Sequence, residues 1–425
     1  MNIEIINTGD ELLLGFRQNT HQKWLGRRLN DLGYRVARQV SIPDNGAAIE
    51  AGVAEALTRA DLIIVTGGLG PTSDDVTRDR IAGLLDLELQ TDTRVLEHLD
   101  AFFAARQRET PERVKVQAEV PAGATVLLNA YGTAPGLAIH VAGGQFRDGA
   151  ASWLIMLPGP PRELYPMFDE QVAPLLQREM PLGAESACVN LRTCGMGESL
   201  VEEHLAEPLA GLVARGLGVH FCLSPGGVDV RLACVGDSAV AIVAEAEEIV
   251  RATLPKHVYG SGDELLEEIV VRTLAETGDT LALAESCTGG LIAHRITNVS
   301  GASQVFLAGL VTYSNKAKQA FLGVRPATLA EHGAVSEETA REMAAGALRE
   351  TGADHALSVT GIAGPTGGTP DKPVGTVFIG LASKSSKALA MKFLNPYDRE
   401  TFKLVTSQQA LEMLRRRLVK DSRRG

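Results

Sequence analysis

Two side chains that act as nucleophiles in enzymes, Ser286 and Cys287, follow an apolar run in the sequence Ala-Glu-Ser-Cys-Thr-Gly-Gly. The run predicts a buried strand, and the residues after Gly290 have the pattern of a helix. Gly289 and Gly290 let backbone N–H groups approach a ligand closely, which suits an oxyanion. Serine and threonine at a helix start are commonly N-caps, so Ser286 or Thr288 can also be only a capping residue.

A lysine that can act as a base follows the next apolar run, in the sequence Tyr-Ser-Asn-Lys-Ala-Lys from Tyr313 to Lys318. In a partly dry pocket a lysine loses its proton and can activate a serine, with the Tyr313 hydroxyl as a relay. Glu285 either pairs with Lys318, orients a substrate or is structural. A third segment is glycine-rich, and its N–H groups can hold a phosphate or a ribose. Its glycines are Gly361, Gly364, Gly367 and Gly368.

A second glycine-rich segment follows an apolar run near the N-terminus, and its glycines are Gly67, Gly68 and Gly70. We expect Ser73, Asp74 or Asp75 to cap the next helix, whose N–H groups would face a ligand anion. Phosphate binding is the simplest interpretation. The two adjacent carboxylates can also hold a Mg²⁺-like ion together with substrate phosphates, although capping alone explains Asp75 equally well.

Strands and helices must position these segments, and the N-terminal part alternates between the two. The pattern predicts strands in residues 2–9, 34–42 and 60–68 and helices at Asn19–Leu32 and Ala47–Thr58. This is the βαβαβ order of a parallel sheet. Glycines and prolines follow the strands that end near Thr66 and Leu157, where the loops of open α/β sheets bind ligands. We therefore predict a site at these strand ends.

The pattern changes around Asp169–Pro181, and residues 188–255 predict a β-α-β-β-α block with a hairpin turn at Pro225-Gly226-Gly227. The block has no convergent catalytic set, which favours a structural or dimerising role. Lys256–Glu264 predicts a linker, and from Leu265 the pattern is again α/β up to a helix over Arg399–Leu418. Lys318 falls at the end of a predicted strand. The predicted domains are residues 1–168, 169–258 and 262–425.

The composition is that of a folded protein of several domains, since 425 residues exceed one core at roughly 100–200 residues per domain. The 41 basic and 52 acidic residues give a net charge of −11, which disfavours direct nucleic-acid binding and a hold on anionic membranes. No secretion signal or apolar run of about 18 residues occurs, so we expect a cytoplasmic protein. The five cysteines form no C-x-x-C pair and are expected to be reduced thiols.

The C-terminal motifs AESCTGG, GLVTYSNKAK, EHGAVSEETA and SVTGIAGPTGGTPDKPVGTVFIG resemble, in order and spacing, the C-terminal domain of the CinA family. The resemblance covers about Leu265–Leu418. The stand-alone form of this domain is nicotinamide mononucleotide deamidase, so the resemblance implies release of ammonia to give nicotinate mononucleotide, without a cofactor. It also implies Ser286 as the nucleophile, Lys318 as the base and Tyr313 as the relay. We assign Cys287 no catalytic role, because it can be a small packing residue.

The resemblance also implies a substrate site around these residues. An acyl-enzyme at Ser286 needs an oxyanion site, for which we expect the N–H groups near Thr288, Gly289 and Gly290. Arg399 is the expected phosphate ligand, in Asn-Pro-Tyr-Asp-Arg-Glu where the family commonly has Gly-Asp-Arg. The residues expected to line the nucleotide are Thr360, Gly361, Gly364 and Thr366.

The N-terminal motifs GDELLLG, GGLGPTSDD, NAYGTAPG and LPGPPREL resemble the molybdopterin-binding-like domain of CinA proteins, a three-layer α/β fold, over roughly residues 1–168. The wider fold family includes molybdenum-cofactor synthesis proteins, whereas CinA members are associated with ADP-ribose pyrophosphatase activity that needs a divalent metal (Mg-, Mn- or Co-like). Fold alone does not choose between these functions. Asn19, Arg78 and Arg162 are further candidates for nucleotide contact. The metal candidates are Asp10, Glu11, Asp74 and Asp75, and the phosphate candidates are Gly67, Gly68, Gly70, Thr72 and Ser73.

The sequence thus predicts a bifunctional hydrolase of pyridine-nucleotide recycling, which acts on ADP-ribose with its N-terminal domain and on nicotinamide mononucleotide with its C-terminal domain. A homodimer through the middle block is our default expectation. One alternative is a molybdopterin-binding protein with a vestigial amidase site. The other is a partner protein in competence or recombination, which the name of the family suggests.

Overall fold

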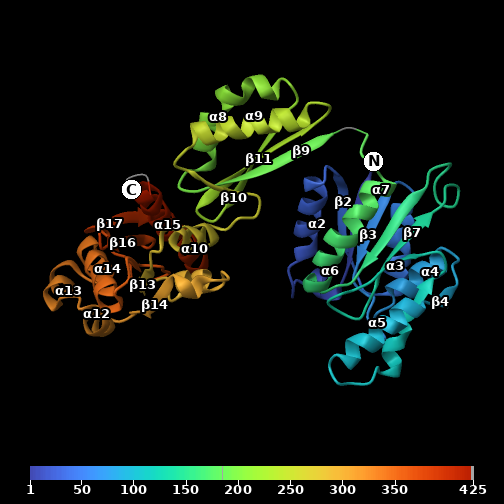
Figure 1. Ribbon diagram of the computed structural model, residues 1–425, viewed down its shortest axis with the longest axis horizontal. Coiled ribbons are helices and arrows are strands. Elements are labelled where there is room, and N and C mark those ends of the chain that lie inside the picture. Colours follow the sequence, from blue (N-terminus) through green and yellow to red (C-terminus); the bar gives the residue numbers. More distant parts are fainter. Residues whose placement is uncertain (184, 423–425) are drawn as a thin grey trace. The chain divides into compact units, whose positions relative to one another are not determined.

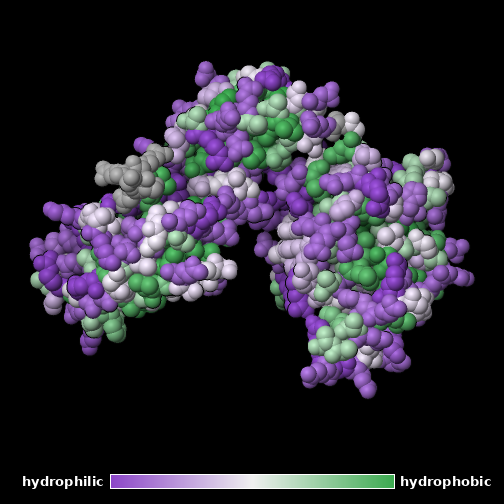
Figure 2. Space-filling model, viewed as in Figure 1, coloured by the Kyte–Doolittle hydropathy of each residue, from purple (hydrophilic) through white to green (hydrophobic). Residues whose placement is uncertain are grey.

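The structure is a computed structural model that describes residues 1–183 and 185–422 (Figure 1). The chain divides into two compact units, each described separately below. Unit 1 is Met1–Ser186 with Val235–Asp237, and unit 2 is Ala187–Cys234 with Ser238–Gly425. Most of the predicted middle domain therefore shares a unit with the predicted C-terminal domain, whereas its first residues belong to unit 1. Hydrophilic residues cover most of the face visible in Figure 2.

Unit 1 contains a six-stranded sheet in the order β2-β1-β3-β8-β7-β6. The first four strands run parallel, and β7 pairs antiparallel with both of its neighbours, β8 and β6. The strands are β1 Ile3–Thr8, β2 Val36–Ile42, β3 Leu62–Thr66, β6 Thr125–Leu127, β7 Gly136–Val141 and β8 Ser152–Leu157, with a separate pair β4 Leu89–Thr91 and β5 Glu119–Pro121. The helices are α1 Asp10–Leu13, α2 Thr20–Asp31, α3 Gly46–Leu57, α4 Thr77–Leu84, α5 Thr93–Ala104, η1 Glu112–Ala118, α6 Pro161–Met167, η2 Phe168–Val172 and α7 Ala173–Glu179.

The central strands of this sheet are buried on both faces, as their near-continuous apolar sequences predict. In β3, Leu62 and Ile64 pack in the cluster with α2, α6 and α7, whereas Ile63 and Val65 pack in the cluster with α3 and α4. Helices thus cover both sides of the sheet, which confirms the predicted α/β fold. The core also continues past the predicted boundary at residue 168, because the side chains of η2 and α7 belong to the first cluster.

Unit 2 begins with a four-stranded sheet in the order β10-β11-β9-β12, covered by two helices. Its elements are β9 Ser186–Thr193, α8 Glu198–Val213, β10 Gly218–Ser224, β11 Gly227–Val235, α9 Ala239–Thr253 and β12 Val258–Ser261. The β-α-β-β-α order is as predicted, and Gly226 in the hairpin turn has φ 81°. The predicted linker Lys256–Glu264 is wrong in part. Its residues Val258–Ser261 form β12, because they pair antiparallel with β9.

The second sheet of unit 2 has the order β14-β13-β15-β16-β17, in which β14, β13 and β15 run parallel. Its strands are β13 Leu281–Glu285, β14 Phe306–Val311, β15 His355–Gly361, β16 Thr376–Ser383 and β17 Ser386–Leu394. Its helices are α10 Leu266–Thr277, α11 Leu291–Thr297, η3 Ala302–Gln304, α12 Asn315–Leu322, α13 Pro326–His332, α14 Glu337–Thr351 and α15 Arg399–Ser422. Among the described residues, no helix is long and apolar enough to cross a membrane.

Helix α12 departs from the sequence prediction, which placed Lys318 at the end of a strand. The strand β14 stops at Val311, and the side chain of Ser314 accepts a hydrogen bond from the N–H of Ala317. This N-cap begins a helix at Asn315. Lys318 therefore lies in the first turn of a helix that packs against α14.

Candidate active sites

Strand β13 determines where the side chains around Ser286 point. Successive side chains of a strand alternate between the two faces of its sheet. Leu281 and Leu283 pack in the cluster with α10, α11 and α15, whereas Ala282 and Ala284 pack in the cluster with α12 and α14. The alternation places the residues that follow in the same way, with Glu285 toward α11 and Ser286 toward α12.

Lys318 contacts Ser286 from this second face of the sheet. Its Nζ donates hydrogen bonds to the Oγ of Ser286 at 2.9 Å and to the carbonyl oxygen of Thr312 at 2.8 Å. Both side chains are buried, with Lys318 1% exposed and Ser286 9% exposed. Burial lowers the pKa of the Lys318 amine, because a dry environment disfavours its charged form. A neutral amine at this place can accept the hydroxyl proton of Ser286.

Glu285 has a structural role on the opposite face. Its buried carboxylate accepts the backbone N–H groups of Gly290 at 3.0 Å, Ile292 at 3.2 Å and Ala293 at 2.8 Å. The carboxylate therefore uses the N–H groups at the start of α11. No hydrogen bond or ion pair joins Glu285 to Lys318 in the described part of the chain.

These bonds change the predicted oxyanion donors. The N–H of Gly290 is held by Glu285, and the N–H of Gly289 donates to the carbonyl oxygen of Ser286 at 3.1 Å. Within residues 1–183 and 185–422, no oxygen atom accepts a hydrogen bond from the N–H of Cys287 or Thr288. These two N–H groups follow Ser286 directly in the chain and lie beside the Cys287 sulfur, and they are the remaining candidates for oxyanion donors. The Cys287 thiol itself is buried, and burial raises its pKa to about 12.

Tyr313 and Arg399 lie together at a more exposed position. The Tyr313 side chain is 61% exposed, and its hydroxyl accepts a hydrogen bond from Arg399 Nη2 at 2.7 Å. Arg399 Nη1 also donates to the carbonyl oxygen of Gly364 at 3.1 Å, so α15 is joined to the glycine-rich loop. No hydrogen bond between Tyr313 and Ser286 or Lys318 occurs in the described chain. The role of Tyr313 as a relay therefore stays a prediction.

The predicted nucleotide residues lie on or beside the end of β15. Thr360 is buried, and its hydroxyl donates to the carbonyl oxygen of Ala334 at 2.7 Å, so it has an internal partner. Gly361 leaves no room for a side chain, since a Cβ there would lie 2.8 Å from the carbonyl oxygen of Thr376. Thr366 is exposed in the glycine-rich loop. Backbone atoms, Thr366 and Arg399 are thus among the polar groups that this region presents.

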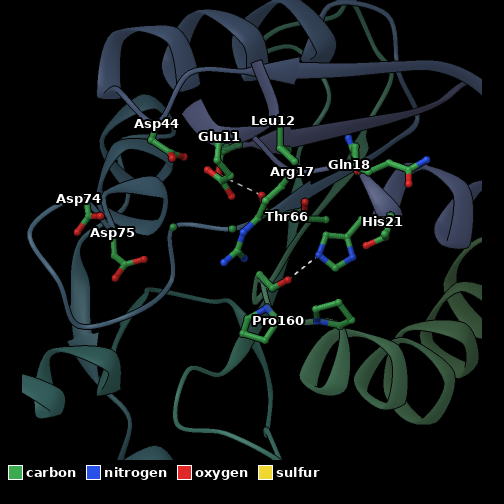
Figure 3. Close-up of a pocket in the computed structure, with 17 residues that line it drawn as sticks. Glu11, Leu12, Arg17, Gln18, His21, Asp44, Thr66, Asp74, Asp75 and Pro160 are labelled. Carbon is green, nitrogen blue, oxygen red and sulfur yellow. Dashed lines mark hydrogen bonds between the residues drawn. The ribbon is translucent and has the colours of Figure 1, made fainter. Parts of the chain in front are cut away.

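Unit 1 has a cavity of about 450 Å³ at the carboxyl ends of its parallel strands, as predicted (Figure 3). Thr8 and Thr66 are the last residues of β1 and β3, Gly159 follows β8, and Asp44 follows β2. All four residues line the cavity. Parallel strands end at one edge of the sheet, so residues distant in sequence meet there. The lining residues are Thr8, Glu11, Leu12, Arg17, Gln18, Asn19, Thr20, His21, Asp44, Thr66, Gly67, Gly68, Asp74, Asp75, Gly159, Pro160 and Pro161.

The glycine-rich loop contributes to this cavity in part. Gly67 and Gly68 line it, but Gly70, Thr72 and Ser73 do not. The predicted capping of the next helix is wrong. Helix α4 begins only at Thr77, after Val76, with no side-chain cap, and the Thr77 N–H donates to the carbonyl oxygen of Gly68. The Asp75 carboxylate instead accepts the N–H and hydroxyl of Thr72, at 3.0 Å and 2.5 Å, which stabilises the loop.

Three of the four metal candidates line the cavity together with Asp44, which sequence reasoning missed. They are Glu11, Asp74 and Asp75. Asp10 does not line it, and its carboxylate accepts the Asp44 N–H at 3.4 Å. Burial raises the pKa of Asp44, and the carboxylates of Glu11 and Asp10 add to this effect. The position of Asp44 just after a parallel strand was the signal that could have found it.

The donors suit a hard divalent cation in their chemistry, because they are carboxylate oxygens. The described residues nevertheless contain no group of three or more His, Cys, Asp and Glu side chains placed to hold one ion. A bound cation would therefore need further oxygen ligands, which the phosphates of a substrate supply.

The three remaining candidates for nucleotide contact in unit 1 differ in their position and hydrogen-bond partners. Asn19 lines the cavity and caps α2, since its side chain accepts the N–H of Gln22. Arg78 is buried and donates to the carbonyl oxygen of Val116 and to Asp79, so it is structural. Arg162 is exposed beside Glu163.

Comparisons with known proteins agree with this organisation. Residues 263–418 match the family described as the CinA C-terminal domain, and residues 4–178 match the one described as a probable molybdopterin binding domain. A CinA-like protein of Akkermansia muciniphila is 44% identical over 411 residues, which cover 97% of this chain and 96% of that protein. The chain belongs to the CinA family. A CinA-like protein of Kosmotoga olearia is 42% identical over 422 residues, which cover 99% of this chain and 99% of that protein.

Among solved structures, the competence/damage inducible protein CihA of Agrobacterium tumefaciens is 43% identical, with a TM-score of 0.35. The match covers 35% of this chain and 91% of that one. The CinA C-terminal match contains Ser286, Lys318 and Arg399, and the molybdopterin-binding match contains the cavity of unit 1. The two predicted resemblances are thus confirmed as the two halves of a CinA protein.

Proposed function

We propose that the C-terminal domain is an amidase that hydrolyses nicotinamide mononucleotide to nicotinate mononucleotide and ammonia. The observation that carries the proposal is the 2.9 Å hydrogen bond between Lys318 Nζ and Ser286 Oγ in a buried environment. Burial favours the neutral amine, which is the form that can act as a base. The choice of substrate rests on the CinA resemblance.

The proposed reaction uses Lys318 in both halves. Lys318 accepts the proton of Ser286 as Oγ bonds to the carboxamide carbon, and the N–H groups of Cys287 and Thr288 stabilise the oxyanion. Lys318 then gives that proton to the amide nitrogen, the C–N bond breaks and ammonia leaves the acyl-enzyme. A water attacks the ester carbon while Lys318 takes its proton and returns it to Ser286 Oγ, which releases nicotinate mononucleotide.

Ammonia release from nicotinamide mononucleotide by the full chain, without added metal, tests this proposal. We expect Ser286→Ala and Lys318→Met each to lower kcat by about 10³-fold or more. Lys316→Ala is a matched control, because Lys316 lies on the same helix and is exposed. Folded wild-type protein that releases no ammonia would contradict the proposal.

For the N-terminal domain we propose hydrolysis of ADP-ribose to AMP and ribose 5-phosphate. The cavity supports this, because it combines the backbone of Gly67 and Gly68 with carboxylates at a strand edge. A divalent cation would be held by one or two of the carboxylates that line the cavity together with the substrate phosphates, and it would neutralise the charge of the diphosphate. The residues of the chain would bind and orient the diphosphate.

Release of AMP from ADP-ribose, with Mg²⁺, Mn²⁺ or Co²⁺ and with EDTA, tests this second activity. Asp44→Asn is expected to abolish the metal-dependent part, and Asp169→Asn serves as a control outside the cavity. A molybdopterin-binding domain would instead bind a pterin tightly and release no AMP. If the chain were instead a partner protein in competence or recombination, its Ser286→Ala variant would keep the cellular role of the wild type.

A further inference from the structure

Arg17 has a particular position in the cavity of unit 1. Among the described residues that line the cavity, it is the only side chain with a permanent positive charge, whereas Glu11, Asp44, Asp74 and Asp75 contribute four carboxylates. His21 does not add a charge, because burial lowers its pKa and its Nε2 donates to the carbonyl oxygen of Gly159. A diphosphate entering this cavity would therefore meet one cation of the chain itself.

The Arg17 guanidinium is not used in an internal ion pair. Within the described chain no carboxylate lies within ion-pair distance of it, although other arginines of unit 1 have such partners, including Arg28 with Asp169 and Arg147 with Asp61. Figure 3 shows the Arg17 side chain pointing into the space between Asp75 and Pro160. A guanidinium left unpaired beside carboxylates has its donors available for a ligand.

The backbone around Arg17 is held in place on both sides. Its N–H donates to the carbonyl oxygen of Glu11 at 3.1 Å, and two residues later Asn19 caps helix α2. The base of the side chain is therefore positioned, while the guanidinium itself is exposed.

We propose that Arg17 binds a phosphate group of a nucleoside diphosphate in this cavity, opposite the carboxylates. The planar guanidinium can donate two parallel hydrogen bonds to phosphate oxygens, which fixes the orientation of the group as well as its charge. The inference rests on the proposed function of unit 1 for the identity of the ligand class.

Calorimetric titration of the full chain with ADP in EDTA, with adenosine as the uncharged comparison, tests the inference. Arg17→Ala is expected to weaken ADP binding at least tenfold, about 1.4 kcal/mol, and to leave adenosine binding unchanged. Arg17→Lys should restore part of the affinity, because it keeps the charge and loses the paired geometry. Arg35→Ala is the matched control, since Arg35 is exposed in the same unit and does not line the cavity.

The outcomes separate this inference from the proposed hydrolysis. Equal ADP affinity for wild type and Arg17→Ala would overturn it, and so would a wild-type chain that binds no ADP. If ADP binding depends on Arg17 but ADP-ribose is not hydrolysed with any of the three metals, the inference holds and the pyrophosphatase proposal fails. An unchanged melting temperature of Arg17→Ala shows that the variant is folded.

Discussion

Lys318 Nζ lies 2.9 Å from Ser286 Oγ, although the first residue is in helix α12 and the second follows strand β13. The same Nζ donates to the carbonyl oxygen of Thr312, the residue after β14. The amine thus joins the ends of two neighbouring parallel strands. The Lys318 side chain is 1% exposed, so its amine is almost entirely removed from bulk solvent.

The pH dependence of the proposed amidase should report the state of Lys318. Burial lowers the pKa of its amine below the ordinary 10.5, and only the neutral amine acts as a base. We therefore expect kcat/KM for nicotinamide mononucleotide to rise with pH along a limb whose apparent pKa is below 10.5. Measurement between about pH 5 and 10 tests this, and a rate that falls over that range as pH rises would contradict it.

The same shift should affect stability. The unfolded chain binds the Lys318 proton more readily than the folded chain, so this residue lowers the unfolding free energy when the pH falls below the unfolded value. In Lys318→Met we expect that pH dependence to be smaller. Urea unfolding of both proteins at several pH values between the folded and unfolded pKa of Lys318 measures the difference, and identical slopes would argue against a neutral buried amine.

Cys287 should not be needed for the reaction. Its pKa of about 12 keeps the thiol protonated at neutral pH, and its side chain is buried. We expect Cys287→Ala to keep most of the amidase activity, and iodoacetamide to leave the native protein active. Loss of activity in a folded Cys287→Ala chain would favour a role for the thiol.

Glu285→Gln should weaken the turn that carries Ser286. The carboxylate accepts three backbone N–H groups, and an amide would offer one oxygen and present its own N–H groups to donors. We expect a loss of about 2–3 kcal/mol in unfolding free energy, together with a lower kcat. Glu276→Gln, an exposed acid of α10, is the control in urea unfolding. A Glu285→Gln chain as stable as wild type would refute the structural role.

Tyr313→Phe tests whether a relay is needed. The Tyr313 hydroxyl contacts Arg399, and Lys318 contacts Ser286 directly. We expect kcat to fall by less than about tenfold, with a larger rise in KM, because Arg399 loses a partner. Initial rates over a range of nicotinamide mononucleotide concentrations separate the two constants. A kcat loss as large as that of Lys318→Met would show that Tyr313 acts as a relay.

Much of the fold could be predicted from local patterns. The buried strands β3 and β13 each contain an unbroken apolar run, residues 62–65 and 281–284. Capped periodic segments such as α2 and α3 lie within one or two residues of their predicted bounds. Helix α12 and strand β12 could not be predicted in this way. The first is short and is separated from the end of a strand by three residues, and the second exists because β9 is available to pair with it.

For the sites, the sequence by itself determined which residues are candidates for chemistry, namely the Ser, Lys and Arg of the C-terminal motifs and the glycines and acids at strand ends. Residue types and spacing are local properties, and the family resemblance is read from them. Only the tertiary structure decided which of these groups meet. It paired Lys318 with Ser286, placed Tyr313 beside Arg399, gave the N–H of Gly290 to Glu285 and brought Asp44 and Arg17 into one cavity with Gly67. Such contacts depend on the order of the strands, the face of the sheet and the path of the loops. These features are determined jointly by residues that are far apart in the chain.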